Sequence, residues 1–172
     1  MRMGTRVPEG VLAARVDALR SAAATVFAPR CVYRRIARAD VAFASRQLDR
    51  HLEGCRDVFL LCATLGVEFD AFLRRASVDS GIDALAVQAI GAAAIEKYVD
   101  GCEGDIRTEL AEGESLARRY SPGYGDFPLA ANRMLVERLD AARRIGVSVT
   151  ETLLLVPSKT VTAVIGVRQS LP

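Results

Sequence analysis

The stretch from Arg119 to Asp126, Arg-Tyr-Ser-Pro-Gly-Tyr-Gly-Asp, combines a cation, aromatic rings and a turn. Pro122 fixes its own φ and Gly123 can adopt a positive φ, so the pair predicts the centre of a type II turn. Arg119 offers a fork of donors that suits a carboxylate, and Tyr124 offers a flat face with a polar tip. An amino-acid-like ligand that carries an aromatic base would use all three features. The alternative is a plain surface turn between two helices.

A second candidate is Glu96, which lies in a segment that predicts a long helix from about Gly81 to Glu112. At about 100° per residue, the residues that share the helical face of Glu96 are Ile82, Leu85, Ala89 and Ala93. A carboxylate on this apolar face needs a partner, which would be either a ligand or a nearby arginine. Both interpretations stay open on the sequence alone.

The composition is that of an ordinary globular protein, with 172 residues, 51% hydrophobic and 26% charged. We expect a single domain over residues 1–172, with residues 1–7 frayed. The net charge of +2 gives no strong attraction to nucleic acid, and no apolar run is long enough to cross a membrane. The four cysteines form no C-x-x-C pair and His51 is the only histidine, so no metal site is expected. With no visible signal peptide, reduced thiols and a cytoplasmic location are expected.

The hydrophobic patterns predict an α+β fold, with one mostly antiparallel sheet covered by helices. Helix is expected to exceed strand. The strands are expected near residues 30–37, 57–64, 147–156 and 160–168. The helices are expected near residues 8–24, 43–52, 67–76, 81–112 and 127–145.

Three segments together resemble the activation (reactivation) domain of cobalamin-dependent methionine synthase and its short stand-alone relatives. Residues 119–124 are similar to the Arg-x-x-Pro-Gly-Tyr motif of that domain. The second segment is Val-Pro-Ser-Lys at 156–159, followed by the predicted strand, and the third is the helix that contains Glu96. The resemblance covers roughly residues 29–167 and implies the fold of that family.

The resemblance implies that the chain binds S-adenosylmethionine and docks onto a cobalamin-carrying domain. In the family, an electron donor such as flavodoxin reduces inactive cob(II)alamin, and the activation domain positions the sulfonium methyl near cobalt. The implied function is a stand-alone reactivation protein that acts on a separate corrinoid protein, most simply a methionine synthase without its own activation domain. The alternative is a module that docks on a corrinoid protein without using S-adenosylmethionine.

The same match implies roles for individual residues. Arg119 would bind the methionine carboxylate of S-adenosylmethionine. The main chain at Ser121 and Gly123 would contact the ligand, and Tyr124 would pack beside it. Glu96 would face the cationic or hydroxyl-bearing part of the ligand.

Ser158 and Lys159 also belong to the family pattern and are therefore candidate ligand-binding residues, although the match assigns them no contact. The family has a ligand-contacting tyrosine directly after this Ser-Lys pair, where the present chain has Thr160 and Val161. A small-molecule sensor or an unrelated methyltransferase is a third interpretation. Against it, no predicted strand is followed by a Gly-rich nucleotide-binding loop.

Overall fold

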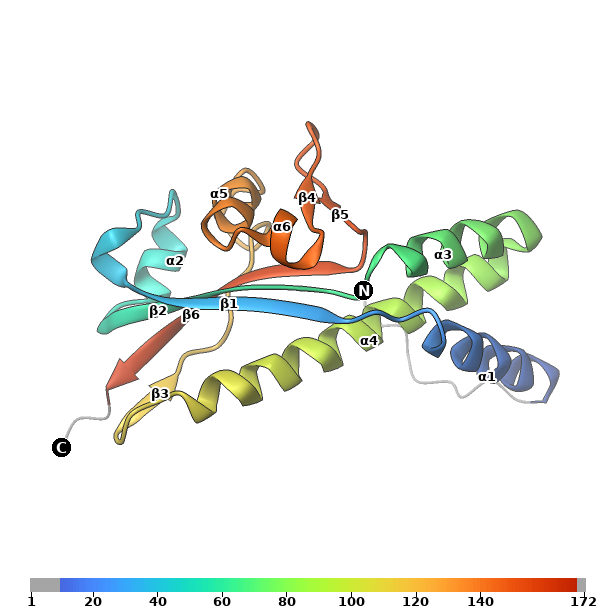
Figure 1. Cartoon of the computed structure of the whole chain (residues 1–172), viewed down its shortest axis with the longest axis horizontal. Coiled ribbons are helices and arrows are strands. Elements are labelled where there is room, and N and C mark those ends of the chain that lie inside the picture. Colours follow the sequence, from blue (N-terminus) through green and yellow to red (C-terminus); the bar gives the residue numbers. More distant parts are fainter. Residues whose placement is uncertain (1–9, 170–172) are drawn as a thin grey trace.

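A computed structural model describes residues 10–169, so the expectation for residues 1–7 lies outside the described part of the chain. The core of the fold is a four-stranded antiparallel sheet with helices on both faces (Figure 1). In order across the sheet, its strands are β1 (Arg30–Ala37), β2 (Cys55–Thr64), β6 (Thr160–Gln169) and β3 (Glu114–Leu116). The predicted α+β class and antiparallel sheet are therefore confirmed.

The central strand β2 is buried on both faces of the sheet. Its residues from Val58 to Thr64 are all buried, and successive side chains point to opposite faces. Leu60 belongs to the hydrophobic cluster on one face, and Phe59 and Leu61 belong to the cluster on the other. The continuous apolar run in the sequence reflects this double burial.

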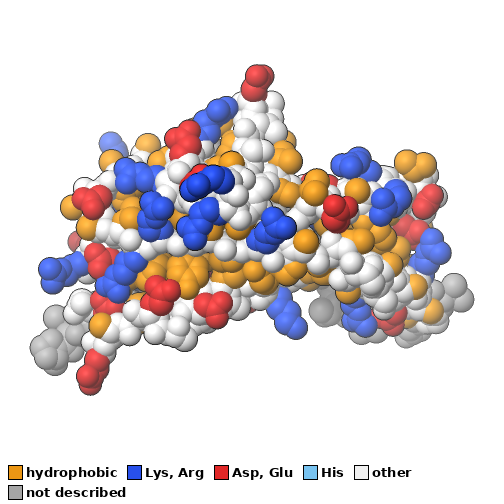
Figure 2. Space-filling view, in the orientation of Figure 1, with side chains coloured by type: hydrophobic (Ala, Val, Ile, Leu, Met, Phe, Trp, Pro, Cys, Tyr) orange, Lys and Arg blue, Asp and Glu red, His pale blue; other side chains and the backbone are white. Residues whose placement is uncertain are grey.

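One face of the sheet is covered by α4 (Gly81–Thr108), which also packs against α1 (Val11–Ala24) and α3 (Val67–Asp79). Figure 1 shows α4 crossing beneath the strands, with α1 and α3 gathered at its N-terminal half. Ser80 begins the helix, because its side chain accepts a hydrogen bond from the N–H of Asp83 at 3.4 Å. Hydrophobic side chains are visible at the seam between the sheet and α4, and acidic and basic side chains are interspersed over this face of the molecule (Figure 2).

The predicted inward face of α4 is wrong. The side chains that α4 buries are those of Val87, Gly91, Ile95, Val99, Cys102 and Ile106, with Asp83 and Glu103. Ile82 and Leu85 are 66% and 72% exposed, and Glu96 lies on the same solvent-facing side. Glu96 is therefore not a carboxylate on a buried apolar face.

The other face of the sheet is covered by three short helices, α2 (Arg46–His51), α5 (Ala131–Arg138) and α6 (Ala141–Ile145). The single helix predicted over 127–145 is wrong, because the chain breaks it at Asp140, which has a φ of 51°. Helix α6 ends at Gly146, whose φ of 72° places it in the left-handed conformation that ends helices.

The strand predicted over 147–156 is also wrong. Its ends form two short strands, β4 (Ser148–Val149) and β5 (Leu155–Val156), which pair with each other. Thr150 turns the chain, because its N–H donates to the carbonyl of Leu154 at 2.9 Å and its carbonyl accepts from the N–H of Leu153 at 3.0 Å. Its hydroxyl also accepts from the N–H of Leu154 at 3.0 Å. Local side-chain hydrogen bonds of this kind compete with strand pairing.

Strand β3 was not predicted, and α4 ends at Thr108 instead of Glu112.

Gly91 permits the close contact between α4 and α3. A Cβ atom added at Gly91 would lie 2.4 Å from Cζ of Phe69 and 2.9 Å from Cε of Lys159. Because Phe69 is fully buried, we expect Gly91→Ala to lower the free energy of unfolding by about 1–3 kcal/mol through overpacking. Denaturant unfolding of the variant and of the unmodified chain measures this difference.

Gly101→Ala is the matched control in the same helix, because a Cβ atom there meets nothing within 4 Å. It should raise the free energy of unfolding by about 0.5–1 kcal/mol, since alanine favours helix more than glycine does. Equal effects at the two positions would contradict the close packing at Gly91.

Candidate functional site

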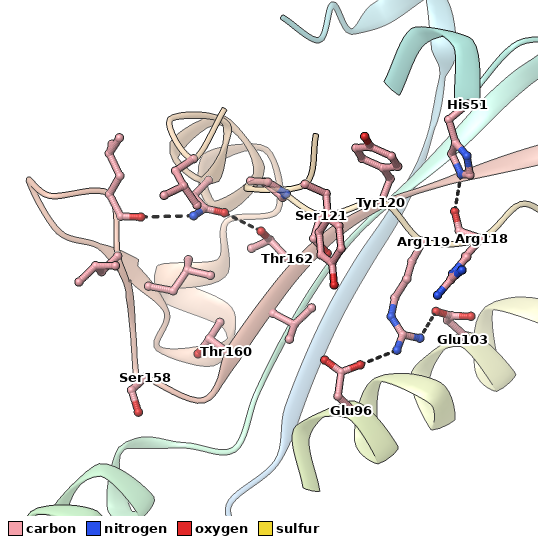
Figure 3. Close-up of a pocket in the computed structure, with 18 residues that line it drawn as sticks. His51, Glu96, Glu103, Arg118, Arg119, Tyr120, Ser121, Ser158, Thr160 and Thr162 are labelled. Atoms are coloured by element: carbon pink, nitrogen blue, oxygen red, sulfur yellow. Dashed lines mark hydrogen bonds and ion pairs between the residues drawn. The ribbon is translucent and has the colours of Figure 1, made fainter. Parts of the chain in front are cut away.

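A cavity of about 880 Å³ lies beside the first residues of β6, between α4 on one side and the β4–β5 hairpin and α5 on the other (Figure 3). Its volume is in the range of sites that hold nucleotide-sized ligands. Five of the seven predicted site residues line it: Glu96, Arg119, Ser121, Tyr124 and Ser158. These come from α4, the turn and the corner before β6, which the fold brings together from distant parts of the sequence.

Gly123 and Lys159 are the two predicted site residues that do not line the cavity. The N–H of Gly123 donates to the carbonyl of Phe127 at 2.8 Å and so is not free for a ligand. Nζ of Lys159 donates to Oε1 of Gln88 on α4 at 2.5 Å, and burial lowers the pKa of this amine. Lys159 therefore stabilises the junction of β6 with α4.

The turn has the geometry that its sequence predicts. Gly123 has a φ of 96°, and the N–H of Tyr124 donates to the carbonyl of Ser121 at 3.2 Å, as in a type II turn. Asp126 then fastens the turn to the start of α2, because its carboxylate accepts hydrogen bonds from the N–H groups of Arg46 and Gln47 at 3.0 and 3.2 Å. The hydroxyl of Ser45 and these two N–H groups hold the pKa of Asp126 below its ordinary value.

The guanidinium of Arg119 is held by three carboxylates of α4. Nη1 lies 2.7 Å from Oδ1 of Asp100 and 2.6 Å from Oε1 of Glu103, and Nη2 lies 2.6 Å from Oε2 of Glu96. Burial alone would lower the pKa of Arg119, but these hydrogen bonds raise it above its ordinary value, so the group stays a cation. The expectation that Arg119 offers its fork to a ligand carboxylate stays a prediction, and within residues 10–169 its two Nη atoms donate to carboxylates of α4.

Two partners were expected for Glu96, a ligand or a nearby arginine, and in the structure its partner is Arg119. The side chain of Glu96 is 58% exposed and reaches Arg119 from the cavity edge (Figure 3). Asp100 is similarly exposed, whereas Glu103 is 9% exposed and also accepts a hydrogen bond from Arg107 at 3.2 Å. Arg119 therefore binds one buried carboxylate, that of Glu103, and two carboxylates that face solvent, those of Glu96 and Asp100.

Sequence reasoning missed His51 and Arg118, which also line the cavity. Nε2 of His51 lies 2.6 Å from the carbonyl oxygen of Arg118. Because a carbonyl only accepts, Nε2 carries the proton and donates. The ring of His51 lies 5.3 Å from the ring of Tyr120. The single histidine and the Arg-Arg pair were visible in the sequence, but nothing there placed them together.

Asn132 and Thr162 form a buried polar pair at the hairpin side of the cavity. The hydroxyl of Thr162 donates to Oδ1 of Asn132 at 2.7 Å, and Nδ2 of Asn132 donates to the carbonyl of Leu153 at 3.3 Å. These bonds fix the base of the hairpin against β6 in one arrangement.

The edge of β6 that faces the cavity offers main-chain hydrogen-bonding groups. Val164 exchanges hydrogen bonds with Tyr120 at this edge, both at 2.9 Å. In an antiparallel strand every second residue directs its N–H and C=O to the same edge, so Thr162 and Thr160 do so as well. Within residues 10–169 no strand pairs with these two residues on that side. A planar heterocycle with adjacent donors and acceptors would match this edge.

No group of three or more histidine, cysteine, aspartate or glutamate residues suited to a metal ion occurs in the described chain. None of its helices has the length and apolar character needed to cross a membrane.

Comparison with known proteins identifies a structural relative but no sequence family. No family model matches the chain, and no curated protein matches it. Among solved structures, the chain is similar to the crystal structure of the MetH reactivation domain bound to AdoHcy. The TM-score is 0.60 at 15% sequence identity, over 95% of this chain and 69% of the other. The likeness confirms the fold expected from the resemblance.

The carboxylates around Arg119 differ in burial, and this predicts different effects on stability. We expect Glu103→Gln to lower the free energy of unfolding by about 1–3 kcal/mol, because it removes a buried charge that faces both Arg119 and Arg107. Glu96→Gln, the exposed counterpart, should cost about 1 kcal/mol or less. Chemical denaturation of both variants makes the comparison, and a larger loss for Glu96→Gln would contradict this division.

Proposed function

We propose that this chain binds S-adenosylmethionine in the cavity beside β6 and presents the methyl group to a cobalamin held by a separate protein. It would act as a stand-alone reactivation protein for a cobalamin-dependent methionine synthase. The observation that carries the proposal is the convergence of the turn motif, α4 and the Ser158 corner on one cavity, in a fold similar to a domain that holds AdoHcy. AdoHcy is what remains of S-adenosylmethionine after it gives up its methyl group.

The cavity suits both ends of such a ligand. The open edge of β6 at Thr160 and Thr162 provides main-chain donors and acceptors for the adenine base. At the other end, the exposed carboxylate of Glu96 lines the cavity and favours the positive sulfonium and ammonium groups. Ser121 and Tyr124 also line the cavity and would contact the ligand.

The rim of the cavity suits a partner with a broad face. Tyr124, Leu129 and Leu154 line the cavity and remain 69%, 46% and 61% exposed. Exposed apolar side chains around an open site are typical of docking surfaces. The corrinoid would supply the nucleophile, and a flavodoxin-like donor the one electron that cob(II)alamin needs. The chain itself would bind the ligand and orient the methyl group outward.

A second candidate function is docking on a corrinoid protein without use of S-adenosylmethionine. It is favoured by one observation, the commitment of Arg119 to protein carboxylates instead of a ligand carboxylate. Isothermal calorimetry with S-adenosylmethionine separates the two functions, because only the first requires heat of binding at a stoichiometry of one.

The full proposal predicts reactivation in trans. A cobalamin-dependent methionine synthase without its activation domain, in the cob(II)alamin form, is mixed with a reductant, S-adenosylmethionine and this protein. Methionine formation should return, and it should be lost when only this protein is omitted. The protein alone should transfer no methyl group, because the nucleophile belongs to the partner. Equal recovery without the protein, with no corrinoid protein captured in pull-downs, would contradict both candidate functions.

A further inference from the structure

We propose that Arg118, the neighbour of the motif arginine, binds the carboxylate at the amino-acid end of the ligand, and that Arg119 is a positioning residue. This inference rests on the proposed function, because it concerns how S-adenosylmethionine lies in the same cavity. It concerns an arginine outside the Arg-x-x-Pro-Gly-Tyr motif.

The surroundings of Arg119 oppose a further carboxylate. Both of its Nη atoms donate to carboxylates of α4 at 2.6–2.7 Å, and its side chain is only 25% exposed. One cation therefore faces three anions, and a ligand carboxylate placed there would add a fourth. Like charges at such separations repel, so the ligand carboxylate is better placed elsewhere in the cavity.

Arg118 has the properties that Arg119 lacks. It lines the same cavity and is exposed. Within residues 10–169 no hydrogen bond or ion pair of the structure engages its guanidinium, although its own carbonyl accepts from Nε2 of His51 at 2.6 Å. The main chain is therefore fixed while the cationic fork is free. A guanidinium of this kind binds a carboxylate through two parallel hydrogen bonds.

Together the two arginines create a site for a zwitterion. The exposed carboxylate of Glu96 suits the α-ammonium group and the sulfonium, whereas Arg118 suits the α-carboxylate. Arg119 fixes the carboxylates of Glu96 and Glu103 on α4, as its bonds to them in Figure 3 show. The chemical class of ligand that the site selects is thus an α-amino acid that carries an additional positive charge.

The test compares S-adenosylmethionine with decarboxylated S-adenosylmethionine, which lacks only the carboxylate, by calorimetry on the full chain. Arg118→Ala should weaken binding of S-adenosylmethionine about ten- to a hundredfold, the effect of losing a charge-assisted hydrogen bond. It should leave binding of the decarboxylated ligand unchanged. Arg144→Ala, which removes an exposed arginine from α6 outside the cavity lining, is the matched control and should change neither affinity.

Arg119→Lys keeps the positive charge beside α4. It should weaken binding of both ligands by the same factor, because it disturbs the carboxylates of α4 but leaves Arg118, which binds the ligand carboxylate, in place. The inference is overturned if Arg118→Ala binds S-adenosylmethionine normally, or if it weakens both ligands equally. A selective loss in Arg119→Lys would return the role to the motif arginine. If the unmodified chain binds neither ligand, the proposed function itself fails and this inference fails with it.

Discussion

Strand β6 is paired with β2 on one side, but on the other side no strand of the described residues 10–169 pairs with its first residues. The chain that follows β3 stays with β6 only as far as Tyr120, which bonds to Val164. There Pro122 and Gly123 turn it away from the sheet. The cavity occupies the edge that this departure leaves open, so its position follows from the turn. The same turn places Ser121 and Tyr124 in the wall of the cavity and, through Asp126, fastens that wall to α2.

The ion cluster around Arg119 holds the opposite wall in place. Arg119 and Glu96 are 23 positions apart in sequence, yet their contact joins the turn to α4 across the end of the sheet. The buried member, Glu103, is satisfied by two arginines, which offsets the cost of removing its charge from water. The two exposed members add little stability on their own. Glu96 instead leaves an exposed carboxylate at the cavity edge, and a structural contact thereby contributes to the chemistry of the site.

The parts of the fold that could be predicted are those in which one signal dominates. The strands β1, β2 and β6 carry continuous or alternating apolar residues, and the structure has them at nearly the predicted positions. The hairpin at 148–156 has the same alternation, but the hydrogen bonds of Thr150 reverse the chain within it. The phase of α4 could not be predicted because alanine occupies both exposed and half-buried positions there. The buried side of α4 carries Val87, Ile95 and Val99, and on that side Gly91 faces Phe69 from a different helix.

The site was predictable to the same extent. The resemblance predicted Glu96, Arg119 and Tyr124 as residues of one site, and all three line the cavity, but it did not give the partner of each side chain. Lys159 follows the corner before β6, and its side chain passes close to Gly91 and bonds to Gln88 on α4. Directions of this kind depend on neighbours that are distant in sequence.

The adjacent residues Arg118 and Arg119 show how one dipeptide connects both layers of the fold. The main chain of Arg118 is bonded to His51 of α2, on one face of the sheet, while the side chain of Arg119 is bonded to α4 on the other. The two helices therefore hold the entrance of the turn from both sides. The carbonyl of Arg118 and the guanidinium of Arg119 make these two attachments. The guanidinium of Arg118 has no such bond within residues 10–169, and Arg118 lines the cavity. Two adjacent arginines therefore differ in what they can do: Arg119 is bonded to three carboxylates of α4, whereas Arg118 is exposed.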